Sequence, residues 1–166
     1  MRSFSVCLAQ VRPRWARDVL SHPYLSPAQV NAAAQSITGT DHCQTGREME
    51  ITYRTSTLVA ALAEYYLRAD LQRTDLAQLN KALGTVPALN ASEDFGLCVA
   101  SHNPAAARAL ALSEPGSPAE AEAARVLTSG IATCTRPDEN LTVDLQSMRA
   151  LNAVALYRAV YQASAR

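Results

Sequence analysis

Ser26-Pro27-Ala28-Gln29 and Ser117-Pro118-Ala119-Glu120 are two versions of one helix start, separated by 91 positions in the chain. In each version a serine precedes a proline, and Gln or Glu follows three positions after the serine. Serine at the N-cap, proline at the first helical position and Gln or Glu at the third form a capping box. The two stretches therefore predict two helices and indicate that a unit of the chain occurs twice.

The spacing of 91 positions is shared by residues throughout the chain. Phe4-Ser-Val-Cys7-Leu-Ala9 aligns with Phe95-Gly-Leu-Cys98-Val-Ala100, and identical pairs continue without a gap as far as Tyr66 and Tyr157. Two copies are too few for a solenoid, so we expect a pseudo-twofold pair of modules. The sequence predicts helical repeat module 1 at residues 1–69, a connector with a short helix at 70–91, and helical repeat module 2 at 92–166.

Start and stop signals predict that both modules are all-α. In the second module and the connector, caps, prolines and glycines place helices at about 75–83, 92–101, 104–112, 118–130 and 144–163, with residues 131–143 irregular. Ser92 is expected to cap the helix that carries Glu93 and Asp94 in its first turn, where the helix dipole favours acids. Residues 49–53 and 141–143 alternate weakly, and a contact between two short strands there is an alternative.

Composition excludes several classes of protein. The chain has 166 residues, of which 48% are hydrophobic and 18% charged, and its 15 basic residues balance its 15 acidic residues. This is unlike a disordered chain or a strongly basic nucleic-acid binder, so we expect no nucleic-acid partner. No stretch of about 18 apolar residues is present, so we expect no membrane span.

The four cysteines fall into two pairs with equal spacing. Four cysteines allow three disulfide connectivities. The repeat selects the one that joins Cys7 to Cys43 and Cys98 to Cys134, one disulfide inside each module. A closed loop of this length contributes about 4 kcal/mol in the chain-entropy model. The alternative is four buried free thiols in a cytosolic protein.

Disulfides predict an oxidising compartment, so we expect a periplasmic or secreted protein. No signal peptide is visible at the start of this chain, and an exported protein would need a leader that this sequence lacks. The cytoplasmic alternative goes with the free-thiol interpretation.

Other chemistry-bearing patterns are weak. His42-Cys43 and Cys98-x-x-x-His102 offer zinc ligands, but the histidines do not repeat while the cysteines do, so we expect no metal and no cofactor. Asp41-His42 with a nearby hydroxyl lacks any motif that would enforce a catalytic site, and we expect no catalytic residue there. Glu93 and Asp94 are interpreted as first-turn charges rather than as an acid–base pair.

The densest basic and aromatic cluster lies before the first capping box. Arg14, Trp15 and Arg17 belong to it, and Arg17 corresponds to Arg108 in the second copy. These four residues are the candidate binding residues, because guanidinium groups recognise phosphates and carboxylates. A repeated arginine is also typical of a structural role, such as donating to the carbonyls at a helix end.

The second module resembles a family of uncharacterised exported bacterial proteins. The similarity rests on Asp94-Phe95-Gly-x-Cys98, on Asn103-Pro104-Ala-Ala-Ala-Arg108, on Pro115-Gly116, on Cys134 and on the closing Ala-Leu-Tyr-Arg run. Those proteins are rich in Ala and Arg and carry the same widely spaced Cys pair. The resemblance implies a helical, disulfide-tied periplasmic protein and implies no activity.

Two hypotheses of function follow. The first is a non-enzymatic helical protein that acts as a binding or interaction module, with a ligand, a protein partner or a second copy in a groove formed by the modules. The second is an enzyme or enzyme accessory whose site between the modules uses Arg14, Trp15, His42 or His102. The enzyme hypothesis requires at least two of these groups in one pocket. The binding hypothesis requires an apolar patch or groove.

Overall fold

The computed structural model describes residues 2–35, 43, 54–135, 141 and 143–162, and these residues form helices and no strand. The first half contains α1 (Arg2–Val11), α2 (Pro13–Ser21), α3 (Pro27–Ala34) and the long α4 (Thr55–Arg73). The all-α prediction is therefore confirmed. Within the described residues, no helix is both long and apolar enough to cross a membrane.

The second half begins after α5 (Leu76–Thr85), which occupies the connector. It contains α6 (Ala91–His102), α7 (Pro104–Leu112), α8 (Pro118–Thr128), the one-turn α9 (Ile131–Cys134) and the long α10 (Leu145–Gln162). Prolines begin α2, α3, α7 and α8, because proline fits the first turn of a helix, where its missing N–H has no partner to lose. In both predicted capping boxes the serine hydroxyl accepts the predicted backbone hydrogen bond.

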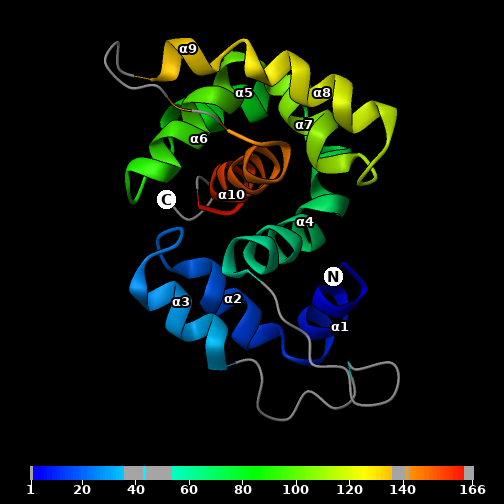
Figure 1. The fold of residues 1–166 in the computed structure, drawn as a ribbon, viewed down its shortest axis with the longest axis vertical. Coiled ribbons are helices and arrows are strands. Elements are labelled where there is room, and N and C mark those ends of the chain that lie inside the picture. The colour runs from blue at the N-terminus through cyan, green and yellow to red at the C-terminus, as the bar shows by residue number, and fades with distance from the viewer. Residues whose placement is uncertain (1, 36–42, 44–53, 136–140, 142, 163–166) are drawn as a thin grey trace.

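The two long helices α4 and α10 lie side by side in the middle of the molecule (Figure 1). The helices α1, α2 and α3 cover one side of this pair, and α5 to α9 surround the other. Both long helices contribute to both hydrophobic cores. Leu58 of α4 and Val154 of α10 belong to the core of the first side, whereas Leu67 of α4 and Leu156 of α10 belong to the core of the second.

Each half has a cysteine pair at disulfide distance. The sulfur atoms of Cys7 and Cys43 are 2.12 Å apart, and those of Cys98 and Cys134 are 2.10 Å apart. This is the connectivity that the repeat predicts. Each pair links the first helix of its half to the chain that precedes the last helix.

Several local predictions need correction. The N-cap of α6 is Asn90, whose side chain accepts from Glu93 N, and not Ser92. Gly84 does not end α5, which continues to Thr85. Residues 131–134 form α9 rather than irregular chain, because Thr135 and Cys134 donate their backbone N–H groups to the preceding turn.

The alternative of paired strands cannot be followed, since residues 49–53 lie outside the described part of the chain. In the other segment of that alternative, 141–143, Leu141 and Val143 are the described residues, and neither is in a strand. Residues 131–134, which precede it, are helical. α4 continues to Arg73, beyond residue 69, where the sequence places the end of the first module.

The turns that follow α2 and α7 share an unusual backbone. Leu25 has φ of +56° and Gly116 has φ of +78°, so both are in the left-handed region. The N–H of Leu25 donates to Gln29 Oε1 at 2.7 Å, and the N–H of Gly116 donates to Glu120 Oε2 at 2.6 Å. The capping-box side chain therefore returns to the preceding turn in both halves. Leucine is strained at such a φ, whereas glycine is not.

Candidate functional site

Arg149 of α10 lies at the centre of a buried charged cluster that joins three helices. Its guanidinium donates to Glu64 Oε2 of α4 at 2.9 Å and to Glu120 Oε1 of α8 at 2.7 Å. It also donates to the hydroxyl and the carbonyl of Ser113, in the turn after α7. These three charged residues are between 4% and 9% exposed. We call them the Arg149 cluster.

The Arg149 cluster has one more carboxylate than it has guanidinium groups. Burial alone lowers the pKa of the Arg149 guanidinium, but hydrogen bonds and charge from Glu64 and then from Glu120 outweigh burial and raise it. Arg149 is therefore permanently charged. Two carboxylates therefore share one guanidinium group.

A cavity of about 540 Å³ opens above this cluster, between α4 and α10. We call it the α4–α10 cavity. Most of its lining is apolar, and the Arg149 cluster forms its charged part. Gln146 and Thr57 also line the cavity. Gln146 Nε2 donates to Thr57 Oγ1 at 2.7 Å, and this hydrogen bond links the first turns of α10 and α4. The other residues that line it are Ala60, Ala61, Pro115, Leu145 and Ala150.

Such a cavity is typical of small-molecule sites, which are concave and mostly apolar and hold a few well-placed polar groups. The sequence does not predict it. Glu64, Glu120 and Arg149 are far apart along the chain, and only the packing of α8 and α10 against α4 brings them together. The one available signal is that charged residues lie inside otherwise apolar helical stretches.

A second buried arginine of α10 has no such opening. Arg158 donates to the carbonyls of Leu20 and His22, at the end of α2, and to Glu93 Oε1 of α6 at 2.8 Å. Arg158 is 1% exposed and the Glu93 side chain 0%. Glu93 also accepts from the N–H groups of Tyr24 and Leu89. Glu93 therefore accepts three hydrogen bonds, and Arg158 ties α10 both to α6 and to the end of α2, although its Nε is buried without a hydrogen-bond partner.

The first-turn interpretation of Glu93 and Asp94 is confirmed for their position, since both lie in the first turn of α6. Only Asp94 is exposed. Glu93 is buried because Arg158 and two backbone N–H groups compensate its charge. The two carboxylates therefore have different surroundings, and Glu93 has a structural partner on α10.

The candidate binding residues of α2 lie away from the α4–α10 cavity. Trp15 donates its ring N–H to the carbonyl of Ala32 at 2.8 Å, which ties α2 to α3. The Arg17 guanidinium carbon lies 5.7 Å from the centroid of the Tyr66 ring, a cation–π distance. Arg14 is exposed.

Arg108 has a structural role, because it donates to the carbonyls at the end of a helix. Its guanidinium donates to the carbonyls of Gln72 and Thr74 at 3.0 Å each, at the C-terminal end of α4. Carbonyls at this end of a helix lack partners within the helix, and the dipole favours a cation there. Arg108 therefore fixes α7 to the end of α4.

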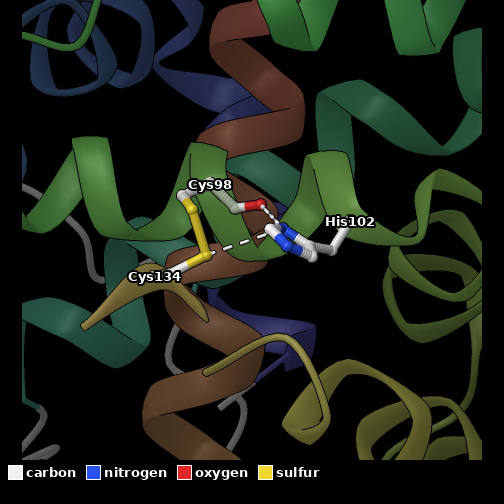
Figure 2. A group of neighbouring side chains, drawn as sticks. All are labelled: Cys98, His102 and Cys134. Carbon is white, nitrogen blue, oxygen red and sulfur yellow. Dashed lines mark hydrogen bonds between the residues drawn. A yellow bond between two sulfur atoms is a disulfide. The ribbon is translucent and has the colours of Figure 1, made fainter. Parts of the chain in front are cut away.

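Of the two histidines proposed for a site, His42 lies outside the described residues. His102 lies at the end of α6 beside the second disulfide, and its Nδ1 is 3.7 Å from Cys134 Sγ (Figure 2). Ligand atoms of Cys98, His102 and Cys134 lie within 4.8 Å of one another, which is close enough to share a metal ion. While the two sulfur atoms are bonded to each other, neither is a thiolate, which is the form that binds zinc.

Comparison with protein-family models, with curated proteins and with solved structures finds no match to this chain.

Replacing Arg158 by Met tests the buried contact between the halves. The change leaves the Glu93 carboxylate buried without its cation, so the free energy of unfolding is expected to fall by about 3–5 kcal/mol. Urea denaturation followed by circular dichroism measures this. Arg125→Met is the matched control, because Arg125 pairs with Glu122 on the surface. The urea midpoint of this variant is expected to equal that of the unchanged protein. Equal midpoints for the two variants would show that the buried pair adds no stability.

The buried phenol of Tyr24 is expected to make the protein less stable at alkaline pH. It is 5% exposed, and burial raises the pKa of its phenol from 10.0 to about 12. Folding therefore favours the neutral phenol, and this stabilisation is complete below pH 10 and disappears between pH 10 and pH 12. Between pH 9 and pH 11, the free energy of unfolding of Tyr24→Phe is expected to fall by about 1 kcal/mol less than that of the unchanged protein. Urea denaturation at the two pH values measures the difference, and equal losses contradict the prediction.

Proposed function

We propose that this protein is a non-enzymatic binding protein of the periplasm or the extracellular space, and that its ligand occupies the α4–α10 cavity. The observation that carries the proposal is a cavity of about 540 Å³, lined mainly by apolar side chains and bordered by the Arg149 cluster. The ligand that fits this chemistry is small and apolar with one positive charge. Its apolar part contacts residues such as Ala61 and Leu145, and its cation balances the excess carboxylate.

The charge argument follows from the burial of the Arg149 cluster. An excess charge in a poorly solvated place is costly, and a counter-charge nearby lowers that cost. Glu64 and Glu120 are 7% and 4% exposed, so solvent screens them weakly. A carboxylate ligand adds a second like charge, and a neutral ligand adds only apolar contact. Binding is therefore expected to favour ammonium over hydroxyl, and hydroxyl over carboxylate.

The proposal includes the duplication of a helical module, with the cavity between the two copies. Helix bounds support it, because α2 and α7 begin and end at positions that differ by 91, and α3 and α8 begin at positions that differ by 91. The two left-handed turns and their bonds to Gln29 and Glu120 support it further, since these positions also correspond. In this interpretation α4 and α10 are the equivalent long helices of the two modules. The cavity between them is a product of the pairing.

The two disulfide-distance pairs support the proposed compartment. Disulfides persist in oxidising surroundings and are rare where thiol reductants are abundant. Each pair closes a loop with a sequence separation of 36 and ties the first helix of its half to the chain that precedes the last helix. The free-thiol alternative requires four reduced cysteines, which conflicts with these distances.

The enzyme hypothesis has less support. It needs at least two of Arg14, Trp15, His42 and His102 in one cavity. The described residues that line the α4–α10 cavity include neither Arg14, Trp15 nor His102, and His42 lies outside the described part of the chain. Arg14 and Trp15 belong to α2, whereas His102 ends α6.

Three matched compounds test the proposed ligand chemistry. Hexylammonium, hexanol and hexanoate share one alkyl chain and differ in charge. Hexylammonium is expected to bind most tightly and hexanoate most weakly, with chemical-shift changes at α4 and α10 in NMR titrations. Equal affinities, or shifts confined to other helices, would contradict the charge argument.

Filling the cavity supplies the matched control. Ala61 lines the cavity and is half-buried, so Ala61→Phe is expected to weaken hexylammonium binding by at least about tenfold. Ala121→Phe adds the same side chain on the exposed face of α8, and is expected to leave binding unchanged. If Ala61→Phe binds as well as Ala121→Phe, the ligand lies elsewhere.

A further inference from the structure

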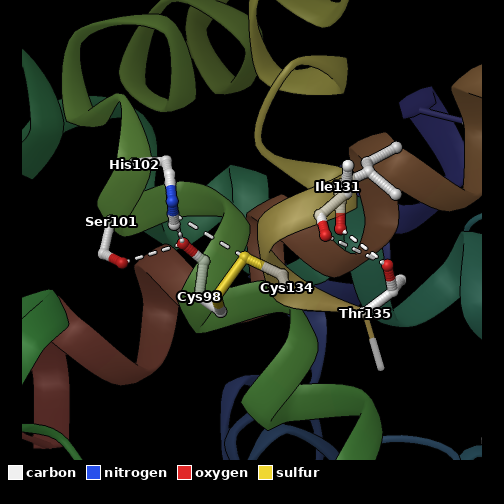
Figure 3. The surroundings of a disulfide bond; sticks show 7 residues. Cys98, Ser101, His102, Ile131, Cys134 and Thr135 are labelled. Atoms are coloured by element: carbon white, nitrogen blue, oxygen red, sulfur yellow. Dashed lines mark hydrogen bonds between the residues drawn. A yellow bond between two sulfur atoms is a disulfide. The ribbon is translucent and has the colours of Figure 1, made fainter. Parts of the chain in front are cut away.

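The disulfide of the second half has a polar neighbour that points at one of its two sulfur atoms. Cys98 and His102 lie one turn apart on α6, and Cys134 is the last residue of α9 (Figure 3). His102 Nδ1 lies 3.0 Å from the carbonyl oxygen of Cys98 and 3.7 Å from Cys134 Sγ. The imidazole therefore approaches the sulfur of Cys134.

The carbonyl contact fixes where the imidazole proton lies. A carbonyl oxygen accepts hydrogen bonds and cannot donate them, so His102 Nδ1 must carry a hydrogen, whether the ring is neutral or charged. That N–H faces both the Cys98 carbonyl and Cys134 Sγ. A sulfur atom that becomes a thiolate at this position acquires a ready hydrogen-bond donor.

His102 is exposed, and its Cβ lies close to the chain that enters α9. Gly130, at the start of α9, is buried, and a Cβ built there would lie 3.2 Å from the Cβ of His102. Glycine thus allows the chain that enters α9 to pass close to the histidine.

The disulfide is open to small molecules. Cys98 and Cys134 both line a cavity of about 710 Å³ that runs between the start of α6 and the start of α10. Phe95, Leu151 and Val143 supply apolar surface there, and Asp94, Ser147 and Thr133 supply polar surface. Both cysteines are half-buried, so a low-molecular-weight thiol can reach the sulfur atoms.

We infer that the Cys98–Cys134 disulfide is a thiol-exchange site for a small thiol, and that His102 selects Cys134 as the leaving group. The thiolate RS⁻ attacks Cys98 Sγ and forms a new RS–S bond to it. The Cys98–Cys134 bond breaks, and its electron pair stays on Cys134 Sγ as a thiolate, which the Nδ1–H of His102 stabilises. Charge and atoms balance without any oxidant, and a better-stabilised leaving thiolate departs faster.

The disulfide of the first half provides an internal comparison. Four residues after the helix cysteine, where the second half has His102, the first half has Val11, whose side chain has no hydrogen-bond donor. Cys43 is 5% exposed, whereas Cys134 is half-buried. The proposed exchange therefore uses a histidine at a position where the first half has a valine, and it lies outside the α4–α10 cavity.

Timed reaction with 2-mercaptoethanol, followed by alkylation and peptide mass mapping, tests the inference. The Cys98–Cys134 bond is expected to open before the Cys7–Cys43 bond, with mercaptoethanol on Cys98 and the alkyl group on Cys134. Mercaptoethanol mainly on Cys134, or earlier opening of the Cys7–Cys43 bond, would overturn the inference. This part of the test needs no substitution, so it does not depend on how a variant folds.

A pair of histidine variants isolates the role of the ring. His102→Val copies the residue of the first half and is expected to slow opening of the Cys98–Cys134 bond by about fivefold to tenfold, with no change at Cys7–Cys43. His22→Val is the matched control, because His22 pairs with Asp18 at the end of α2. Equal rates for His102→Val and His22→Val would overturn the assignment of His102.

Discussion

Two buried arginines on one helix hold this molecule together. Arg149 and Arg158 both belong to α10, and each donates to backbone carbonyls in one half as well as to a carboxylate. Arg149 reaches the turn between α7 and α8, and Arg158 reaches the corresponding turn between α2 and α3. A guanidinium group has five donors in a rigid plane, so one side chain can fix a turn and a carboxylate together. Moving the first half away from α10 would separate Arg149 from Glu64, and Arg158 from the carbonyls of Leu20 and His22.

This constraint explains why the proposed binding cavity lies where it does. The contact between Arg158 and Glu93 is closed to solvent, because both side chains are at most 1% exposed and Glu93 also accepts from two backbone N–H groups. At the Arg149 end the cluster has an extra carboxylate and borders an apolar space. A buried arginine of α10 therefore forms a closed contact in one place, at Arg158, and borders a cavity in another, at Arg149.

The second difference between the halves lies at the disulfides. Both halves have the same connectivity, but only the second has a histidine one turn after its helix cysteine. The proposed binding in the α4–α10 cavity and the proposed exchange at Cys98 use cavities that both border α10 but share no lining residue. Loss of one is therefore compatible with retention of the other.

Local signals predicted much of the fold. Proline and serine gave the starts of α3, α7 and α8 because those helix ends are decided by a few neighbouring residues. The equal spacing of the cysteines in the two halves predicted which cysteines pair. Asn90 was missed as a cap because Ser92, with acids after it, has the same local features.

Long-range charge pairing was not accessible in this way. Glu93 looks like any first-turn acid, and nothing in the sequence relates it to Arg158, which lies 65 positions away. The same holds for Glu64 and Arg149, whose pairing depends on how α4 packs against α10. The candidate site rests on those contacts, so it becomes visible only in three dimensions.

The central claim is that α10 couples the two halves into one cooperative unit. Trp15 is the only tryptophan and lies in α2, so its fluorescence reports on the first half, whereas far-ultraviolet circular dichroism reports on all helices. Urea unfolding of the oxidised protein is predicted to give the same midpoint by both methods, as two-state behaviour requires. A tryptophan transition that separates from the loss of helix would show that the halves unfold independently, and would contradict the account.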